Sequence, residues 1–330
     1  MLRIFHGTTY DFIKPWRIAV GLTIAFIAVG LVYLGIHGLN RSIEFTGGTL
    51  MQLEFTQPPN VGDIRSTVDA AGYPNSEIQQ FGSTREFTVR AAGHATADGT
   101  AVENTATQIQ AALERKFGPS TLKVVRTEIV GPRVGEELTR NAIIALLLSL
   151  VVTMVYLAIR FEWRFGVAAV IATGHDLLST LAFLAIMRLE VSLTVIAALL
   201  TVIGYSLNDT IIIFDRVRED LKKNRTDSLY TVLNKAINET LPRSVLTHAT
   251  VAAATLSLLL FAGEVIRPFS WIMLFGIVTG TFSSIYVAGP VLLWIERKWP
   301  RKTMDKNLAA RAAAKDLPRP EPRTPVATSR

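Results

Sequence analysis

An acidic side chain, Asp209, lies inside an apolar run that begins near Leu193 and is long enough to cross a bilayer. Tyr205, Asn208 and Asp209 have the spacing that places them on one face of a helix. A carboxylate in the centre of a membrane helix costs roughly 2.5–3.5 kcal/mol on insertion scales, so it is expected to face a bundle interior, have a partner or carry a proton. One interpretation is a structural Asp that joins helices by hydrogen bonds, and the other is a carrier of protons or ions. We predict the second, with Asp209 as the functional centre.

The next apolar run opens with Arg243, in the same half of the membrane as Asp209. Its side chain is long enough to reach that carboxylate, and a positive charge favours the ionised form whereas burial disfavours it. A group balanced between these effects can load and release a proton. Position alone equally allows an arginine that only extends to the membrane surface. Thr247 and Thr250 continue the Arg243 face, which favours a side turned toward the bundle.

A second polar pair, His175 and Asp176, lies near the middle of another apolar run. Adjacent residues on a helix point about 100° apart, so we expect that the two do not form a site by themselves. A lone buried His is more often structural, whereas Asp176 is predicted either to join the Asp209 network or to be structural. No metal-ligand spacing involves His175 or His248, so we predict no metal site.

The composition is that of a membrane protein. The chain has 330 residues, of which 49% are hydrophobic and 18% charged, against about 25% charged in soluble domains. The formal net charge is +7, but Lys and Arg gather beside apolar runs instead of forming one patch, so the charge indicates membrane topology rather than nucleic-acid binding. The absence of cysteine excludes disulfides, thiol catalysis and cysteine-ligated zinc, and no phosphate-binding loop or dinucleotide motif is present.

Six apolar runs predict six membrane-spanning helices. They cover residues 18–36, 141–159, 165–187, 193–214, 244–262 and 269–295. Basic residues precede the first run and follow the second, fourth and sixth, whereas the two short loops on the other side carry only Arg188 and Arg267. The positive-inside rule therefore predicts both termini in the cytoplasm and residues 41–139 outside.

Residues 41–139 show the pattern of a small α+β domain between the first and second spans. Strands are predicted at 49–55, 77–81, 86–90 and 122–130, and helices at 60–71 and 101–117. The order β-α-β-β-α-β is that of the ferredoxin-like arrangement. The simplest interpretation is a folded module with no chemistry of its own, and residues 92–100 are predicted to be a mobile loop.

The remaining domain predictions follow from patterning. Residues 1–40 form the cytoplasmic N-terminus and first span, and residues 140–298 form the other five spans. Within them, residues 216–242 predict a cytoplasmic amphipathic segment that lies along the membrane or against the bundle. The Pro-rich residues 299–330 predict a disordered cytoplasmic tail. Small residues at four-residue intervals in the sixth span predict close helix packing; they are Gly276, Gly280, Ser284 and Ala288.

Several motifs together resemble the SecF family. This family is the smaller partner of SecD in the bacterial Sec translocase, within the resistance–nodulation–division (RND) superfamily. The motifs are Phe45-Thr46-Gly47-Gly48-Thr49, Gly131-Pro132 with Val134-Gly135, His175-Asp176, Asn208-Asp209-Thr210 with Ile213-Phe214-Asp215-Arg216, and Arg243. The chain departs from the family pattern at four positions, which are Ser42 and Glu44 after the first span and Pro242 and His248 around Arg243.

The resemblance implies a membrane all-α six-helix bundle that is half of an RND-type twelve-helix core, with an extracytoplasmic ferredoxin-like domain between helices 1 and 2. It implies a subunit of the bacterial inner membrane that, with SecD, uses the proton gradient to promote preprotein export through SecYEG. YajC is a further candidate partner, the proton is the coupling ion, and no cofactor is expected. In the family the residues that match Asp209 and Arg243 take part in proton coupling; we predict that Asn208, Asp176 and His175 join them.

Other classes remain open from the sequence. The chain could be half of an RND-type exporter of lipids or small molecules, although such pumps usually carry both halves in one chain. It could also be a passive scaffold of the translocon in which Asp209 is structural. An enzyme is the least favoured class, because no nucleophile and base converge in one compartment.

Overall fold

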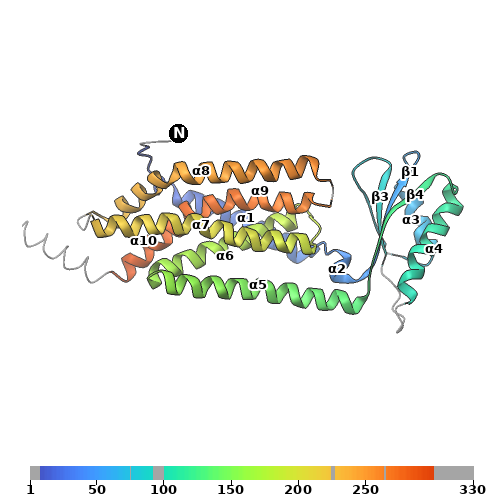
Figure 1. Ribbon diagram of the computed structural model, residues 1–330, viewed down its shortest axis with the longest axis horizontal. Helices are drawn as coiled ribbons and strands as arrows, with labels where there is room; N and C mark the ends of the chain where they lie inside the picture. Colours follow the sequence, from blue (N-terminus) through green and yellow to red (C-terminus); the bar gives the residue numbers. More distant parts are fainter. Residues whose placement is uncertain (1–7, 75, 92–99, 224–226, 264, 301–330) are drawn as a thin grey trace, which may run out of the picture.

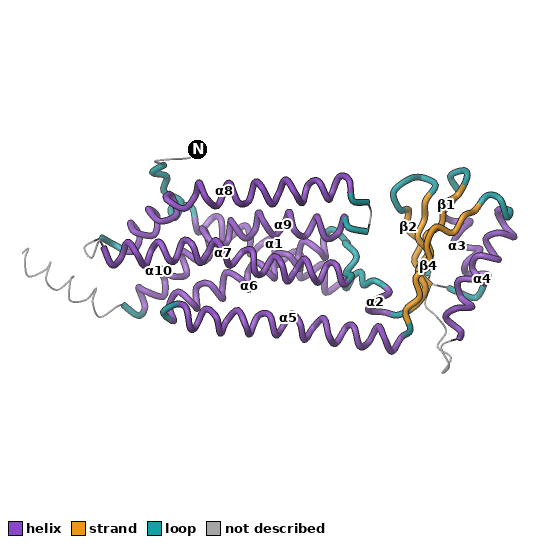
Figure 2. The backbone as a smooth tube through the Cα atoms, in the orientation of Figure 1, coloured by secondary structure: helices purple, strands orange, loops and turns teal. Residues whose placement is uncertain are grey.

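A long helical bundle carries a small sheet domain at one end in this computed structural model (Figures 1 and 2). The structure describes residues 8–74, 76–91, 100–223, 227–263 and 265–300. The bundle contains α1 (Trp16–His37), α5 (Pro132–Arg160), α6 (Trp163–Ile186), α7 (Leu193–Lys223), α8 (Leu229–Phe261), α9 (Arg267–Ser283), the π-helical turn η1 (Ser284–Ala288) and α10 (Gly289–Lys298). Residues 92–99 of the predicted loop and 301–330 of the predicted tail lie outside the described residues.

Six helical stretches of the described chain are long and apolar enough to cross a membrane: α1, α5, α6, α7, α8, and α9 to α10 taken together. The six predicted spans are therefore confirmed. In the most apolar segment of each stretch, half of the residues are buried in α6 and in α7, and 67% are buried in α9 to α10. The buried share is only 6% in α1 and 11% in α5 and in α8. Hence α6, α7 and α9 form the centre of the bundle, and the other three helices leave wide apolar faces uncovered by this chain.

The segment 216–242 is not a separate amphipathic helix, which corrects that prediction. Its first residues continue α7 as far as Lys223, and its last part forms the opening turns of α8 from Leu229 onward. Val232, Leu233 and Ile237 are buried against the bundle. The apolar period that indicated a surface helix therefore belongs to the ends of two long helices that pack on each other.

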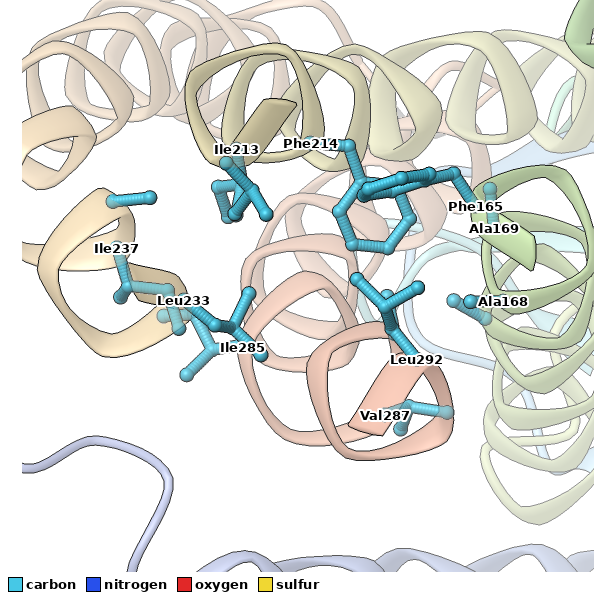
Figure 3. Packing of buried hydrophobic residues seen from close by; sticks show 14 of the residues in the cluster. Phe165, Ala168, Ala169, Ile213, Phe214, Leu233, Ile237, Ile285, Val287 and Leu292 are labelled. Atoms are coloured by element: carbon cyan, nitrogen blue, oxygen red, sulfur yellow. The ribbon is translucent and has the colours of Figure 1, made fainter. Parts of the chain in front are cut away.

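The apolar core near this end of the bundle joins α5, α6, α7, α8, η1 and α10 (Figure 3). Phe165 of α6 and Phe214 of α7 meet edge to face with ring centroids 5.2 Å apart, the arrangement that aromatic pairs prefer. Leu233 of α8 and Leu292 of α10 fill the space beside them. Because this end also carries Arg160, Arg164, Arg216, Arg218, Lys222, Lys223, Lys235, Arg297 and Lys298, we call it the basic end.

Two glycines set the distance between α9 and α7. A Cβ atom on Gly276 would lie 2.3 Å from the side chain of Val202, and one on Gly280 would lie 2.9 Å from the Cβ of Ser206. Neither position has room for a side chain, so the two helices meet almost backbone to backbone. The predicted packing role of these glycines is confirmed, and it brings Ser206 directly against α9.

The sheet domain has the predicted β-α-β-β-α-β order. Its elements are β1 (Gly48–Phe55), α3 (Val61–Ala70), β2 (Glu77–Gln80), β3 (Glu86–Ala91), α4 (Thr100–Phe117) and β4 (Leu122–Val130), with antiparallel strands in the order β2-β3-β1-β4. The two helices cover the face turned away from the bundle (Figure 1), and alternate residues of β1 and β3 point into the core beneath them. The domain is narrower than the predicted 41–139, because α5 already begins at Pro132.

A glycine-rich turn joins the bundle to the sheet. The short helix α2 (Ile43–Thr46) ends at Gly47, whose φ of 70° suits glycine. A Cβ on Gly135 of α5 would lie 2.9 Å from the backbone nitrogen of Gly47, so this contact also needs glycine. From α2, the Glu44 carboxylate accepts a hydrogen bond from the backbone N–H of Leu193 at 2.6 Å. That acidic group caps the first turn of α7, where the helix dipole favours a negative charge.

Candidate functional site

Asp209 lies between three helices in the interior of the bundle. It is 3% exposed, and its Oδ2 is 3.0 Å from Nε2 of His248 on α8. The other ring nitrogen of His248, Nδ1, is 2.7 Å from the hydroxyl of Thr281 on α9. A small cavity beside the carboxylate is lined in part by Thr281 and Ser284. The space within it that the centre of a water molecule can occupy is about 10 Å³. Such a volume is at the lower limit for one bound water.

Asp176 lies at the contact of α6 with α7 and α9 and is 1% exposed. Its Oδ2 accepts hydrogen bonds from the hydroxyls of Ser206 on α7 and Ser283 on α9, the latter at 2.7 Å. Its Oδ1 is 3.1 Å from Nδ1 of His175. A buried carboxylate is thus satisfied by small donors from three helices, without an arginine or lysine.

His175 and Asp176 contact each other, but Asp176 also depends on Ser206 and Ser283, which agrees with the expectation that the two do not form a site by themselves. The 100° step describes the directions of the Cα–Cβ bonds, whereas the imidazole is long enough to turn back toward the adjacent carboxylate. The result is a second buried pair of a His and an Asp, one helix away from the first.

The two carboxylates belong to one layer of polar side chains. Ser206, which contacts Asp176, precedes Asp209 by three residues on α7, and Thr210 bonds to Ser284 at 2.8 Å. The layer thus spans α6, α7, α8, α9 and the start of η1. We call the following set the polar layer: His175, Asp176, Ser206, Asp209, Thr210, His248, Thr281, Ser283 and Ser284.

Arg243 and Asn208 are not part of this layer. Both side chains are exposed in the described chain, and the ion pair that Asp209 forms is with His248. The suggested Arg243–Asp209 contact is therefore wrong for the chain by itself. His248 lies five positions after Arg243 on α8, so the two side chains point to different sides of the helix. Arg243 instead lines a surface hollow together with Glu239 near the basic end.

The functional contact that sequence reasoning missed is that of His248. It was weighed only as a metal ligand and as a departure from the family pattern, although a His in an apolar run at the depth of Asp209 is itself a signal. Ser284 was predicted only as a small packing residue and Ser283 was not predicted at all, but both belong to the polar layer: Ser283 donates to Asp176 and Ser284 bonds to Thr210.

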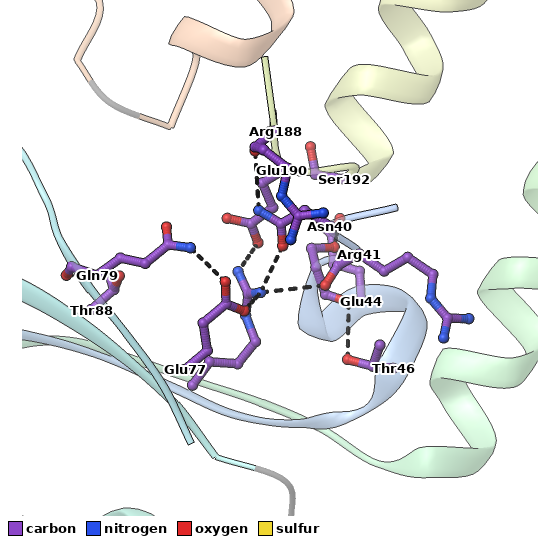
Figure 4. Close-up of polar contacts among 12 residues, drawn as sticks. Asn40, Arg41, Glu44, Thr46, Glu77, Gln79, Thr88, Arg188, Glu190 and Ser192 are labelled. Carbon is purple, nitrogen blue, oxygen red and sulfur yellow. Dashed lines mark hydrogen bonds and ion pairs between the residues drawn. The ribbon is translucent and has the colours of Figure 1, made fainter. Parts of the chain in front are cut away.

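A second polar cluster lies where the sheet domain meets the bundle (Figure 4). Arg90 of β3 is 2.6 Å from Glu77 of β2 and 2.6 Å from Glu190 in the loop between α6 and α7. The same guanidinium donates to the side chain of Asn40 and the backbone oxygen of Arg41, both after α1. Burial raises the pKa of Glu190 above its ordinary value, and the charge of Arg90 offsets part of this rise. We call these five residues the outer cluster.

Comparisons with known proteins agree with this architecture. Residues 109–298 match the family described as protein export membrane protein SecD/SecF, C-terminal, and residues 32–59 match the SecD/SecF GG motif. The chain belongs to the SecD/SecF family. Among its relatives, the protein translocase subunit SecF of Gemmatimonas aurantiaca is 58% identical over 316 residues, covering 94% of each chain. That of Vibrio alginolyticus is 39% identical over 285 residues, covering 86% of this chain and 89% of the other.

Two solved SecDF structures share the fold. SecDF of Thermus thermophilus, described as a translocon-associated membrane protein, matches with a TM-score of 0.78 and 36% identity. The match covers 88% of this chain but only 39% of that SecDF chain. SecDF in its super-membrane-facing form matches with a TM-score of 0.63 and 35% identity, over 93% of this chain and 40% of the other. Membership of the SecD/SecF family thus makes this chain a multi-pass component of protein export.

Proposed function

We propose that the chain acts with SecD to couple the proton gradient to preprotein export through SecYEG, with the Asp209 site as the centre of proton coupling. The observation that carries the proposal is the burial of this carboxylate among three membrane-spanning helices, beside a titratable His248 and without a lysine or arginine bound to it. An acid held in this way changes the charge of the bundle interior when it gains or loses a proton.

SecD as partner is supported by a polar face that this chain leaves open. Thr201 and Asn208 of α7, and Arg243 and Thr250 of α8, are exposed although they lie in membrane-spanning helices. The hydroxyls of Thr201 and Thr250 donate to backbone oxygens of their own helices, but lipid offers no partner to the amide of Asn208 or the guanidinium of Arg243. Helices of a second bundle are therefore the expected cover. SecYEG and YajC follow as further partners from the family resemblance.

The orientation follows from charge. The basic end would face the cytoplasm together with both chain termini, and the sheet domain would lie outside the bacterial inner membrane. Asp209 then sits in the cytoplasmic half of α7, because that helix runs from the sheet domain toward the basic end.

Movement could reach the sheet domain through α7. This helix carries Asp209 in its interior, is capped at its start by Glu44, and follows the loop that holds Glu190. A change of charge at Asp209 that shifts α7 would therefore act on two contacts of the sheet domain. A membrane potential supplies about 2.3 kcal/mol per charge per 100 mV, which is enough to change a two-state equilibrium more than tenfold.

Export of a secreted reporter into inverted membrane vesicles tests the proposal. With a proton gradient, we expect wild type to stimulate export and Asp209→Asn to abolish nearly all of the stimulation while the protein still inserts. Asp215→Asn is the matched control, because Asp215 lies on the same helix but pairs with Arg160 at the exposed basic end. If Asp209→Asn exports like wild type, Asp209 is structural and the chain is a passive scaffold.

A further inference from the structure

His248 makes contacts that go beyond packing. Its ring joins the Asp209 carboxylate on one side, at 3.0 Å, to the Thr281 hydroxyl on the other, at 2.7 Å. The side chain is 12% exposed and that of Asp209 is 4% exposed. The Thr281 hydroxyl is also 2.9 Å from the backbone oxygen of Ile277, and since a hydroxyl has one hydrogen, it donates either to Ile277 or to the ring.

These two choices define two protonation states of the pair. When Thr281 donates to Nδ1, the ring is neutral, its Nε2–H donates to the Asp209 carboxylate, and the pair has a charge of −1. When Thr281 donates to Ile277, its oxygen accepts from Nδ1–H and the neutral pair holds one more proton. That pair is either an imidazolium with an ionised Asp209, or a neutral ring with a protonated Asp209 that donates to Nε2. The step between them adds one proton at Nδ1 and turns one hydroxyl, and neither contact with His248 has to break.

We propose that His248 is the group that takes up the proton of the Asp209 site, with Asp209 remaining ionised as its counter-ion. This inference rests on the proposed proton coupling and names the atom that receives the proton. Imidazole is the more basic partner in water, and its Nδ1–H has an acceptor ready in the Thr281 hydroxyl, which favours the ring as the carrier of the proton. The loaded state buries a neutral pair, which costs less in the membrane than a lone charge.

The surroundings of the ring agree with this assignment. From α7, the two titratable groups that face it are Asp209 and Tyr205, whose ring centroid is 5.2 Å from that of His248. From α9 the described neighbour is Thr281, which is uncharged. On α8 itself, Arg243 lies five residues away on the exposed side. Among these described neighbours, Asp209 is the charged group in direct contact with the ring.

The first test is the pH dependence of proton-stimulated export in vesicles that contain the complete translocase. For His248→Gln, we expect the midpoint to move by at least one unit to acid pH, which corresponds to about a tenfold lower loaded fraction above the midpoint. The matched control is His37→Gln, a substitution of an exposed His at the end of α1, which should keep the wild-type midpoint. A His248→Gln profile that overlies that of wild type would overturn the assignment while leaving the role of Asp209 intact.

Infrared difference spectra of the complete complex give a second measurement, which also decides the case in which His248→Gln abolishes export. Wild type should show no protonated carboxyl band from Asp209 on acidification, because the ring takes the proton. His248→Gln should show that band, and the additional Asp209→Asn substitution should remove it. A band in wild type that Asp209→Asn removes would place the proton on Asp209 and refute the role of His248. Failure of the proposed function is distinct: Asp209→Asn would then retain full stimulation.

Discussion

The polar layer and the outer cluster bury acidic groups in two different ways. In the polar layer, Asp176 and Asp209 are held by hydroxyls and imidazoles, groups that can turn or change their protonation. In the outer cluster, Glu190 is held by Arg90, whose guanidinium stays charged at any physiological pH. The comparison separates a place where charge can change from a place where charge is fixed. Glu44 caps the first turn of α7, and Glu190 lies in the loop before that helix. Because α7 also carries Asp209, it connects the polar layer to the outer cluster.

The most severe disruption is expected from Asp176→Leu. It removes the acceptor of the buried Ser206 hydroxyl and one of two acceptors of Ser283, whose hydroxyl is also 3.1 Å from the backbone oxygen of Gly280. An unsatisfied buried group costs roughly 1–3 kcal/mol, and the leucine must also fit a site shaped for a smaller polar side chain. We expect loss of folded protein, measured by detergent-solubilised yield and thermal unfolding. Asp176→Asn keeps an acceptor oxygen and should fold. If Asp176→Leu were as stable as wild type, the polar layer would not hold the bundle together.

In the outer cluster, Arg90→Ala should loosen the joint between sheet domain and bundle. The substitution leaves the half-buried Glu190, whose side chain is 34% exposed, without its partner. Because water screens part of this loss, we expect a cost at the lower end of about 1–3 kcal/mol. The backbone N–H groups of Ser42 and Val191 bond the segment after α1 to the loop between α6 and α7, where Arg90 also binds. They should then exchange with deuterium about tenfold faster or more. Arg126→Ala, which removes a half-exposed pair with Glu128 within the sheet domain, should leave that exchange unchanged. Equal exchange in both variants would show that Arg90 does not hold the joint.

The side chains of the polar layer can meet only if α9 packs closely on α7. The substitution Gly276→Ala tests this close packing. The new methyl would lie 2.3 Å from the side chain of Val202, and such overpacking costs about 1–3 kcal/mol. A lower midpoint of thermal unfolding is expected, with partial recovery when Val202→Ala is added. Gly204→Ala is the control, because nothing lies within 4 Å of a Cβ there. A Gly276→Ala protein as stable as this control would contradict the packing.

Thr281→Val should have the smallest effect. It removes the acceptor for Nδ1–H of the loaded His248 and also the donor to the unloaded ring, so the two losses partly cancel. We expect an acid shift of the export midpoint of less than one unit, since the charged form loses the stronger bond. A shift to alkaline pH would mean that the hydroxyl favours the unloaded ring.

Local patterns in the sequence predicted most of the fold. Apolar runs marked the six spans, period-two alternation marked strands such as Thr49–Phe55, and the spacing of Gly276 and Gly280 marked a close helix contact; all three are confirmed. These features depend on neighbours along the chain, which is why the sequence contains them.

Contacts between elements that are distant along the chain were harder to predict from the sequence. Whether His248 or Arg243 meets Asp209 depends on the rotation of α8 about its axis, which packing decides and no local pattern records. Arg90 and Glu190 are 100 residues apart and meet only because the sheet domain folds down onto the loop. The amphipathic period of 216–242 was real, but the period cannot tell a surface helix from the packed ends of two long ones.

The π-helical turn in the last span has a mechanical consequence. Pro290 has no N–H to donate to the preceding turn, and the ladder of α9 widens over Ser284–Ala288 just before it. Adjacent serines at this point serve different helices, Ser283 bonding to α6 and Ser284 to α7. The final span can therefore bend at the depth of Asp176 and Asp209, where the π-helical turn lies. Such a bend tilts α10 at the basic end, while Gly276 and Gly280 keep α9 packed against α7.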